Sequence, residues 1–317
     1  MTVRIPQSQA FRCTRENGAS KWPERGSEVR RGDIILPKLR PSFKIKPDQP
    51  VFTIGSCFAR NIESALKNRG YSVPAFEYRL PKEELYGVTQ QQSGFLNKYT
   101  PQSMLQEIAF AFGDTDGSEY LIEVQGGWID GQCHSNKPVS LERALARRQE
   151  VRDLYRTAIK DAGLVIITFG LIEAWWDRAN QNYLNATPYP SMISAHQERF
   201  DFEILDPIDA INCATKTVEL IREHGGADTN IMVTVSPIPL QRTFAPDDVL
   251  TANCYSKSVL RVAAEAVVNK FDRADYYPSY ESISVSDPDA TWEDDMVHVK
   301  LGAVKENVER MIDIYSA

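Results

Sequence analysis

The residue with the clearest potential for chemistry is Ser56, which follows a short apolar run and precedes an expected helix. Residues 50–54 read Pro-Val-Phe-Thr-Ile, as in a buried strand, and Gly55 allows a tight turn with close approach of a substrate. A serine at the start of a helix lies beside free backbone N–H groups, which stabilise a developing oxyanion. Such a serine is also a common helix N-cap, and this feature alone favours the cap.

A carboxylate and an imidazole near the C-terminus supply a base for such a serine. Asp295 and His298 are three residues apart, so within one turn the carboxylate reaches the ring. It would fix the tautomer and stabilise the cation that forms when His298 takes the serine proton. The chain has only four histidines, and this spacing alone is common and often incidental. Together with Ser56, the pair predicts nucleophilic catalysis.

Cys57 is a rival nucleophile beside Ser56, because a helix N-terminus lowers the pKa of a thiol. The side chains of adjacent residues diverge, however, so only one of the two is expected to face a cleft. We expect Cys57 to pack inward.

Strands and helices alternate along the chain, which predicts a three-layer α/β/α sandwich with a mainly parallel sheet. The run Leu-Val-Ile-Ile-Thr at 164–168 is apolar throughout, as in a parallel strand that helices cover on both faces. Strands are expected at 50–54, 71–76, 164–168, 231–235 and 274–277, and a hairpin is expected around 120–128. Helices are expected directly after Ser56, at 101–112, at 140–162, from residue 206, at 252–270 and at the C-terminus.

Three of these strands end in polar or glycine-containing turns. They are Gly55-Ser56, the segment 168–170 and Ser236-Pro237. Ligands of parallel sheets bind at the carboxyl ends of the strands, so we expect these turns to lie along one edge and to form the site.

The chain divides into a polar, basic N-terminal arm, residues 1–48, and a single catalytic domain, residues 49–317, with an insertion expected around 172–205. The basic arm is more typical of a solvated segment than of a nucleic-acid patch. The net charge of −7 argues against a nucleic-acid partner. No window has the length and apolarity of a membrane span, and the five scattered cysteines are typical of reduced thiols. These features predict a cytoplasmic protein; the oligomeric state stays open.

The sequence resembles the GSCFA family, a branch of the SGNH/GDSL hydrolase superfamily. The segment 53–59 reads Thr-Ile-Gly-Ser-Cys-Phe-Ala and contains the motif that gives this family its name. The resemblance extends over about residues 45–312. It is carried by further segments that match the family at 96–101, 168–175, 234–237, 256–258, 277–281 and 295–298.

The resemblance implies an SGNH-type site. In that superfamily the serine, here Ser56, attacks an acyl carbonyl, the histidine, here His298, acts as general base and then general acid, and the aspartate, here Asp295, orients the ring. The reaction is that of an esterase or an O-acetyltransferase, and one sequence does not separate hydrolysis from transfer. No cofactor and no metal are expected.

The resemblance also implies an oxyanion hole made of the N–H of Ser56, a glycine N–H and an asparagine side chain. The family's third block usually reads Gly-x-Asn, but here Gly170 is followed at the third position by Ile172, which cannot donate. Asn97 is the expected replacement donor, and Gly94 is a further candidate for a backbone N–H. Loss of one such donor typically lowers the rate ~100- to 1000-fold.

The substrate is expected to be a small-molecule or glycan ester with hydroxyl groups, such as a carbohydrate or polysaccharide precursor. Trp175 and its neighbour Trp176 could stack on a sugar ring or simply pack in the insertion, and Glu173 could support the site or satisfy nearby backbone groups. The competing class is a non-catalytic glycan-binding or assembly protein on the same scaffold, for which the missing asparagine is the best support. The sequence gives little support to the hypothesis of nucleotide binding, because no phosphate-binding glycine motif is present.

Three basic residues could meet an anionic substrate, namely Arg242, Lys257 and Arg261. Scattered basic residues are usually solvated, and the sequence leaves both interpretations open.

Overall fold

A sheet of parallel strands forms the centre of the domain. The computed structural model describes residues 3–24, 34–86 and 94–317. Within them the central sheet has the strand order β1-β4-β8-β9, and all its pairs are parallel. The predicted three-layer α/β/α sandwich with a parallel sheet is confirmed, and four of the five predicted strands are present. Their bounds are β1 Val51–Gly55, β4 Leu164–Phe169, β8 Asn230–Val235 and β9 Ala274–Tyr277.

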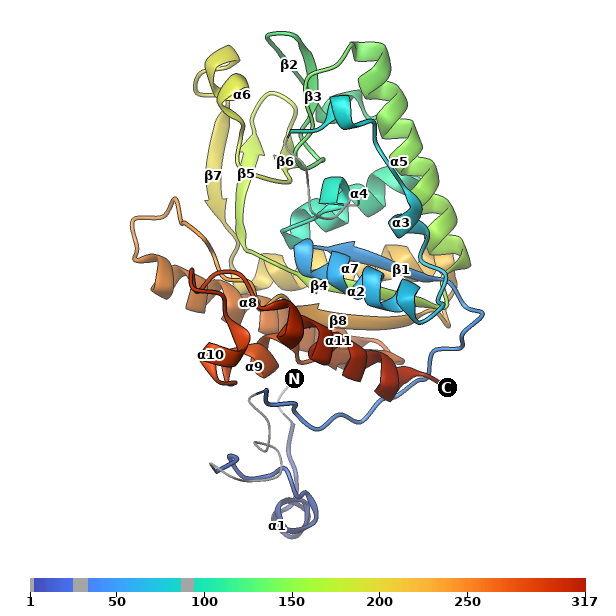
Figure 1. Ribbon diagram of the computed structural model, residues 1–317, viewed down its shortest axis with the longest axis vertical. Helices are drawn as coiled ribbons and strands as arrows, with labels where there is room; N and C mark the ends of the chain where they lie inside the picture. Colours follow the sequence, from blue (N-terminus) through green and yellow to red (C-terminus); the bar gives the residue numbers. More distant parts are fainter. Residues whose placement is uncertain (1–2, 25–33, 87–93) are drawn as a thin grey trace.

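Helices cover both faces of the sheet because the side chains of each strand point alternately to either side. In β4, Val165 and Ile167 pack in the larger core, beneath α4, α5, α7 and α8. Leu164 and Ile166 pack in the second core, beneath α2 and α11, which lie side by side in Figure 1. The bounds are α2 Cys57–Asn68, α4 Pro101–Phe112, α5 Leu141–Asp161, α7 Pro207–Gly225, α8 Val249–Lys270 and α11 Leu301–Tyr315.

Two smaller antiparallel sheets lie above the central one (Figure 1). The hairpin β2–β3 occupies the position expected for a hairpin. A second sheet has the order β6-β5-β7 and occupies the segment in which an insertion was expected. The bounds are β2 Leu121–Val124, β3 Gly127–Asp130, β5 Glu173–Asp177, β6 Asn182–Leu184 and β7 Phe200–Ile204, with the short helices α6 Pro190–Ala195, α9 Ser279–Ser284 and α10 Pro288–Thr291.

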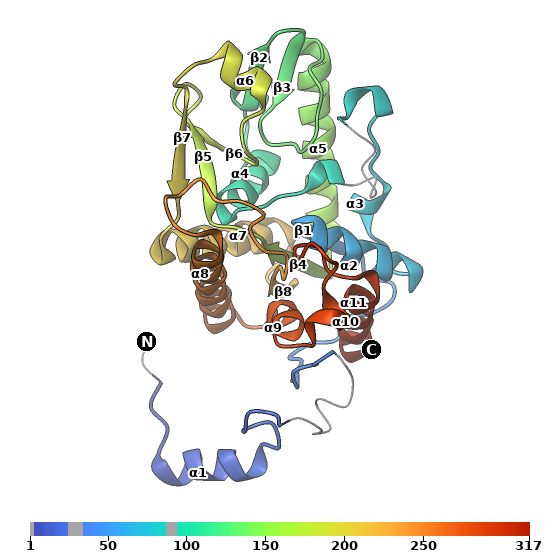
Figure 2. The same cartoon turned by 60° about the vertical axis from the view of Figure 1, so that its left-hand side comes forward.

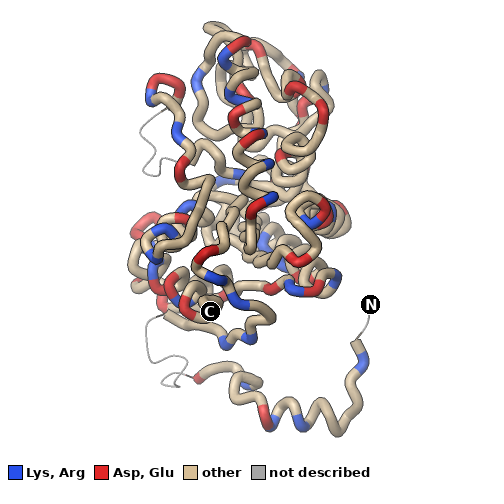
Figure 3. Tube along the Cα trace, turned by 90° about the vertical axis from the view of Figure 1, so that its right-hand side faces the viewer, with Lys and Arg blue, Asp and Glu red and all other residues tan. Residues whose placement is uncertain are grey.

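The N-terminal arm changes character along its length. Helix α1, Gln7–Glu16, has no buried residue and extends away from the domain in Figure 2. The end of the arm packs onto the domain through the buried side chains of Ile35, Phe43 and Ile45. Figure 3 shows basic and acidic residues interspersed over the domain. None of the helices in the described parts of the chain is long and apolar enough to cross a membrane.

The prediction of a strand at 71–76 is wrong. This segment instead leads into the short helix α3, Pro74–Glu77, because Pro74 takes the first helical position, where its missing N–H costs nothing. A single backbone hydrogen bond from Val51 to Ser72 joins the segment to the sheet. The predicted helix at 252–270 begins earlier, at Val249, where Asp248 caps it.

Gly55 lies so close to β4 that no side chain fits. A Cβ atom on Gly55 would be 2.6 Å from the Cβ of Thr168 and 2.7 Å from its carbonyl oxygen. These contacts are backbone and branched side-chain atoms that cannot swing away. The glycine therefore fixes how closely β1 can approach β4 just before Ser56.

We predict that Gly55→Ala destabilises the protein by at least about 2 kcal/mol, since the strands must separate to admit the methyl group. Thermal denaturation measures this. Gly302→Ala is the matched control, because a Cβ there meets nothing within 4 Å. A Gly55→Ala variant as stable as the control would contradict the close packing.

Candidate active site

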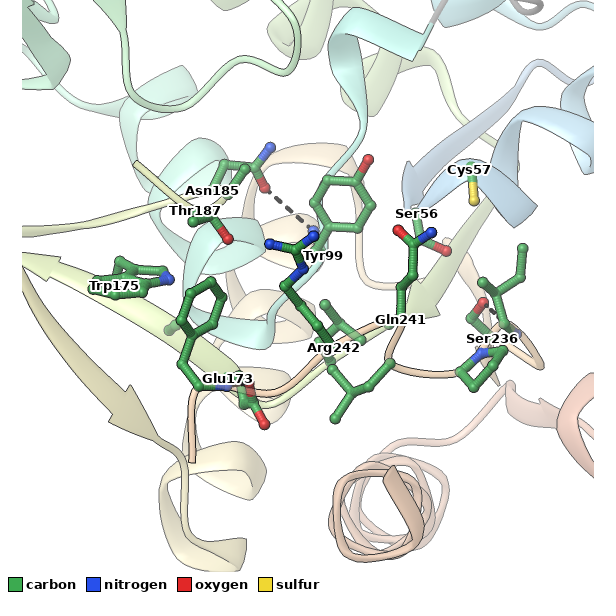
Figure 4. Close-up of a pocket in the computed structure, with 18 of the residues that line it drawn as sticks. Ser56, Cys57, Tyr99, Glu173, Trp175, Asn185, Thr187, Ser236, Gln241 and Arg242 are labelled. Atoms are coloured by element: carbon green, nitrogen blue, oxygen red, sulfur yellow. Dashed lines mark hydrogen bonds between the residues drawn. The ribbon is translucent and has the colours of Figure 1, made fainter. Parts of the chain in front are cut away.

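A cavity of about 290 Å³ opens at the carboxyl edge of the sheet. Each of the three turns expected to meet there contributes to its wall, through Ser56, Gly170 and Ser236. The sheet β6-β5-β7 and the loop after β8 complete the wall of the cavity (Figure 4). The polar and aromatic side chains that line the cavity are Ser56, Cys57, Tyr99, Glu173, Trp175, Asn185, Thr187, Ser236, Gln241, Arg242 and Phe244.

Ser56 does not act as a helix cap. It occupies the N-cap position of α2, yet its side chain accepts no hydrogen bond from the helix. The residue is only 3% exposed, and its Oγ has no hydrogen-bond partner among the described residues. A buried hydroxyl without a partner is unfavourable unless something else binds it. The hydroxyl of Ser56, a residue that lines the cavity, therefore has hydrogen-bonding capacity that no described residue uses.

Cys57 also lines the cavity, beside Ser56 (Figure 4), and not only the interior as expected. Burial raises the pKa of the Cys57 thiol, and this effect exceeds that of the backbone N–H groups that lower it. A thiol with a raised pKa is a poor nucleophile near neutral pH. The electrostatic environment thus favours Ser56 over Cys57.

A buried ion pair anchors the segment that passes under Ser56. The N–H of Lys98 donates to the carbonyl oxygen of Gly55 over 2.8 Å, and its Nζ lies 2.5 Å from the carboxylate of Glu107. Arg148 pairs with the same carboxylate over 2.8 Å. Burial alone would raise the pKa of Glu107, but Arg148 and Lys98 together lower it to about 2. The segment around Lys98 is therefore held by charges with little access to water.

Gly170 approaches Ser56 closely, but its N–H is already bonded. A Cβ on Gly170 would be 2.8 Å from the carbonyl oxygen of Tyr99 and 3.4 Å from the Cβ of Ser56. The N–H groups of Gly170 and Leu171 both donate to Tyr99 O, over 3.1 and 2.8 Å. In this arrangement neither N–H points to an oxyanion, so Gly170 shapes the wall beside Ser56.

Asn97 and Gly94, the other expected donors, do not line the cavity. The Asn97 side chain is buried, its Nδ2 donates to the hydroxyl of Tyr99 over 3.2 Å, and its Oδ1 has no partner in the described parts of the chain. Gly94 is buried in a short 3₁₀ turn, where its carbonyl oxygen accepts the N–H of Asn97. Asn97 therefore lies behind Tyr99, one layer away from the cavity.

Asp295 and His298 form the expected pair. Asp295 Oδ2 lies 2.5 Å from His298 Nδ1, and Asp295 Oδ1 accepts the N–H groups of Val297 and His298 over 2.9 Å each. The backbone N–H and ring of His298, with the N–H of Val297, lower the pKa of Asp295 to about 2. An ionised carboxylate only accepts hydrogen bonds, so the ring of His298 carries a proton on Nδ1.

This pair does not line the cavity and makes no hydrogen bond to Ser56 Oγ. The turn before α11 is at the same end of the sheet as the start of α2 in Figures 1 and 2. The His298 side chain is 63% exposed, and no hydrogen bond joins its ring to Ser56 Oγ. A bridge between Trp292 and Val299 closes the turn at its base. The structure thus places the hydroxyl and the base pair at one edge of the sheet without joining them.

The two residues expected to bind substrate have different roles. Trp175 forms an aromatic wall of the cavity and meets the ring of Phe244 at a centroid distance of 5.0 Å. Both carboxylate oxygens of Glu173 accept hydrogen bonds from the loop after β8, one from the hydroxyl of Thr243 over 2.5 Å and one from the N–H of Phe244 over 3.4 Å. Trp176 points to the other face of β5, where it packs on Tyr183.

The three basic residues whose role the sequence left open lie in three different environments. Arg261 pairs with Glu265 and Glu281 on the surface, whereas Arg242 reaches into the cavity (Figure 4). Lys257 is buried beneath it, and its Nζ donates to the carbonyl oxygens of Gly170 and Ile238 over 2.9 and 2.7 Å. Burial lowers the pKa of Lys257 to about 7. This lysine ties the turn after β4 to the loop after β8.

The sequence reasoning missed Gln241. Gln241 lines the same cavity as Ser56, is drawn in front of it in Figure 4, and its carboxamide has no hydrogen-bond partner among the described residues. The only signal was its place, a few residues after the strand end at Ser236-Pro237.

A comparison with known protein families matches residues 50–311 to the model of the GSCFA family. The chain belongs to the GSCFA family. The match covers most of the chain and confirms the resemblance inferred from the motif at 53–59. No curated protein matches the chain.

The GSCFA domain holds no cluster of three or more His, Cys, Asp or Glu side chains suited to a metal ion within the residues that the structure describes.

We predict that Lys257 makes the stability of this GSCFA domain depend on pH. Its folded-state pKa of about 7 lies below the value of about 10.4 expected in the unfolded chain. Between these values the unfolded state binds more protons, so the contribution of Lys257 to stability rises with pH. Relative to Lys257→Met, the wild type should gain about 2–3 kcal/mol between pH 6 and pH 9.

Guanidinium denaturation of both proteins at the two pH values measures this difference, and groups common to both cancel. An equal stability difference at pH 6 and pH 9 would show that the buried amine does not change its charge.

Proposed function

We propose that this protein carries out serine-type acyl-ester chemistry, as an SGNH-type hydrolase or O-acyltransferase acting on a hydroxyl-bearing substrate. The observation that carries the proposal is the hydroxyl of Ser56. It lies at the N-terminus of α2 on the wall of a cavity, buried and without a partner in the described residues. In a serine that only capped the helix, the side-chain oxygen would accept a hydrogen bond from a backbone N–H group of that helix.

In the first step Ser56 Oγ attacks the acyl carbonyl while His298 Nε2 accepts its proton. Asp295, ionised and bonded to Nδ1, stabilises the imidazolium. The ester C–O bond then breaks, His298 returns the proton to the leaving hydroxyl, and an acyl-serine remains. This step requires the exposed turn of His298 to close over the cavity when the substrate is bound. Catalytic hydrogen bonds are often long in free enzymes and tighten only in the complex.

Gln241 is our candidate for the amide donor that the sequence lacks at Ile172. A carboxamide supplies the same N–H chemistry as the asparagine of the family motif, and that of Gln241 lines the same cavity as Ser56 (Figure 4). The free N–H groups at the start of α2 add their partial positive charge to the same place. Asn97 supports this arrangement indirectly, through the hydroxyl of Tyr99.

Hydrolysis and acyl transfer differ only in the second step. Water or a second hydroxyl attacks the acyl-serine, with His298 now removing the proton from the attacking oxygen. The cavity favours a hydroxyl-bearing ring, since Trp175 offers an aromatic face and Thr187 offers a hydroxyl group on the same wall. A carbohydrate or polysaccharide precursor fits this combination.

One observation favours the alternative of a non-catalytic glycan-binding protein. No hydrogen bond joins Ser56 to His298, and the N–H of Gly170 is bonded to Tyr99. A protein that only binds sugars needs the cavity but not the base, so activity measurements separate the two functions.

We predict that purified protein hydrolyses p-nitrophenyl acetate and that Ser56→Ala lowers kcat/KM at least about 1000-fold, because the nucleophile is lost. Cys57→Ala is the matched control on the same wall and should retain activity within a few-fold. Equal rates for the wild type and Ser56→Ala would remove the serine mechanism. Loss of activity in Cys57→Ala alone would assign the nucleophile to the thiol.

We also predict that His298→Gln lowers kcat about 100- to 10,000-fold, because the proton of Ser56 then has no acceptor. Asp295→Asn should lower kcat by a comparable factor through the wrong tautomer. His196→Gln serves as the control, since this exposed histidine bonds the carbonyl oxygen of Glu123 on the small sheets. If His298→Gln and His196→Gln are equally active, the turn does not close onto Ser56.

A further inference from the structure

The cavity beside Ser56 contains one charged group that nothing in the described chain neutralises. Arg242 lines the cavity, and its guanidinium extends into it toward Tyr99 and Thr187 (Figure 4). No ion pair or hydrogen bond to Arg242 occurs among the described residues. Arg242 is exposed, so water solvates its guanidinium in the free protein, and the planar fork of N–H groups is open to carboxylate or phosphate oxygens.

Glu173 is the one carboxylate on the described wall of the cavity, and it is already in use. Its two oxygens bind Thr243 and the N–H of Phe244, the residues that immediately follow Arg242. Glu173 therefore fixes the loop that carries Arg242 without pairing with its charge.

The loop is anchored on the other side of Arg242 as well. The N–H of Leu240 donates to Asn253 Oδ1 over 3.0 Å, and the carbonyl oxygen of Ile238 accepts from the buried Lys257. Arg242 thus extends from a loop that is held at both ends, which fixes the point from which its side chain reaches the cavity.

The charge of Arg242 acts locally. The chain has a net charge of −7, and acidic and basic residues are interspersed along the chain in Figure 3. An anion is therefore not drawn to the domain by a general positive field. A guanidinium at this place discriminates between ligands only once they are in the cavity.

We propose that Arg242 binds an anionic group, a carboxylate or a phosphate, on the same molecule whose ester is placed at Ser56. This inference rests on the proposed function and specifies its substrate class as acidic esters, such as acylated uronic acids or acylated sugar phosphates. A cavity of about 290 Å³ lies at the small end for ligand sites, so the ester and the anion belong to one sugar-sized unit. Its ring would lie against Trp175.

The first experiment compares acetate release from three substrates, an O-acetyl methyl glucoside, the matching O-acetyl glucuronide and an O-acetyl glucose phosphate. The wild type should prefer an anionic substrate over the neutral one. Arg242→Gln should reduce this preference about 10- to 100-fold, the effect of losing a charge-assisted hydrogen bond. Arg242→Lys should restore part of it. The glucuronide and phosphate arms separate the two sources of negative charge.

Arg261→Gln is the matched control, because Arg261 is on α8 and pairs with Glu265 and Glu281 outside the cavity. It should keep the wild-type preference. Equal kcat/KM values for neutral and anionic esters in the wild type, or an unchanged preference in Arg242→Gln, would overturn the inference.

A binding measurement keeps this inference separate from the ester chemistry. Glucuronate, glucose 6-phosphate and glucose are titrated by calorimetry into Ser56→Ala and into Ser56→Ala with Arg242→Gln. Binding of an acidic sugar that is lost with Arg242 supports the subsite even if no ester is hydrolysed. Serine-dependent hydrolysis without any such binding would leave the proposed function standing and refute the role of Arg242.

Discussion

The close packing of backbone around Ser56 is the constraint on which the rest of the site depends. Gly55 meets Thr168 at distances that exclude any side chain, and Gly170 meets the carbonyl oxygen of Tyr99 in the same way. With the chain held on both sides, the turn between β1 and α2 has little freedom. Ser56 thus has a fixed place at the start of α2, where its side chain makes no cap hydrogen bond and the residue lines the cavity.

Buried charges maintain this packing from behind. Lys98 and Glu107 pair with almost no exposure to water and hold the segment that bonds the carbonyl oxygen of Gly55. Lys257 bonds the carbonyl oxygens of Gly170 and Ile238 and joins two of the three turns that form the cavity. Buried polar groups of this kind cost free energy unless every partner is in place, so they enforce one arrangement of the turns.

The base side of the site is built differently. Asp295 and His298 are on an exposed turn that is closed by hydrogen bonds within itself, so their mutual geometry does not depend on the rest of the domain. The nucleophile is thus fixed by the core, whereas the base is preassembled on the surface. Under our proposal, substrate binding brings the two together and excludes water from the ester.

The predictable parts of this protein were those with local signals. The strand before Ser56, the buried strand at 164–168 and the Asp295–His298 spacing follow from apolar runs and short-range geometry. The segment at 71–76 was mistaken for a strand because its apolar residues outweighed the effect of Pro74.

Tertiary contacts decided the rest of the site. The bond between the N–H of Gly170 and Tyr99 O joins segments distant in sequence, so no local pattern predicts that this donor is occupied. Gln241 and Arg242 are on a loop without a motif, and only its anchoring on Glu173 and Lys257 places them in the cavity.

The most direct test of the central claim is covalent trapping of the nucleophile. The protein is incubated with an aryl alkylphosphonate ester, and the modified residue is identified by intact mass and peptide mass spectrometry. Our account predicts a single adduct on Ser56 that forms in the wild type and in Cys57→Ala but much more slowly in His298→Gln. No adduct under conditions that leave the protein folded, or an adduct on Cys57 instead, would contradict it.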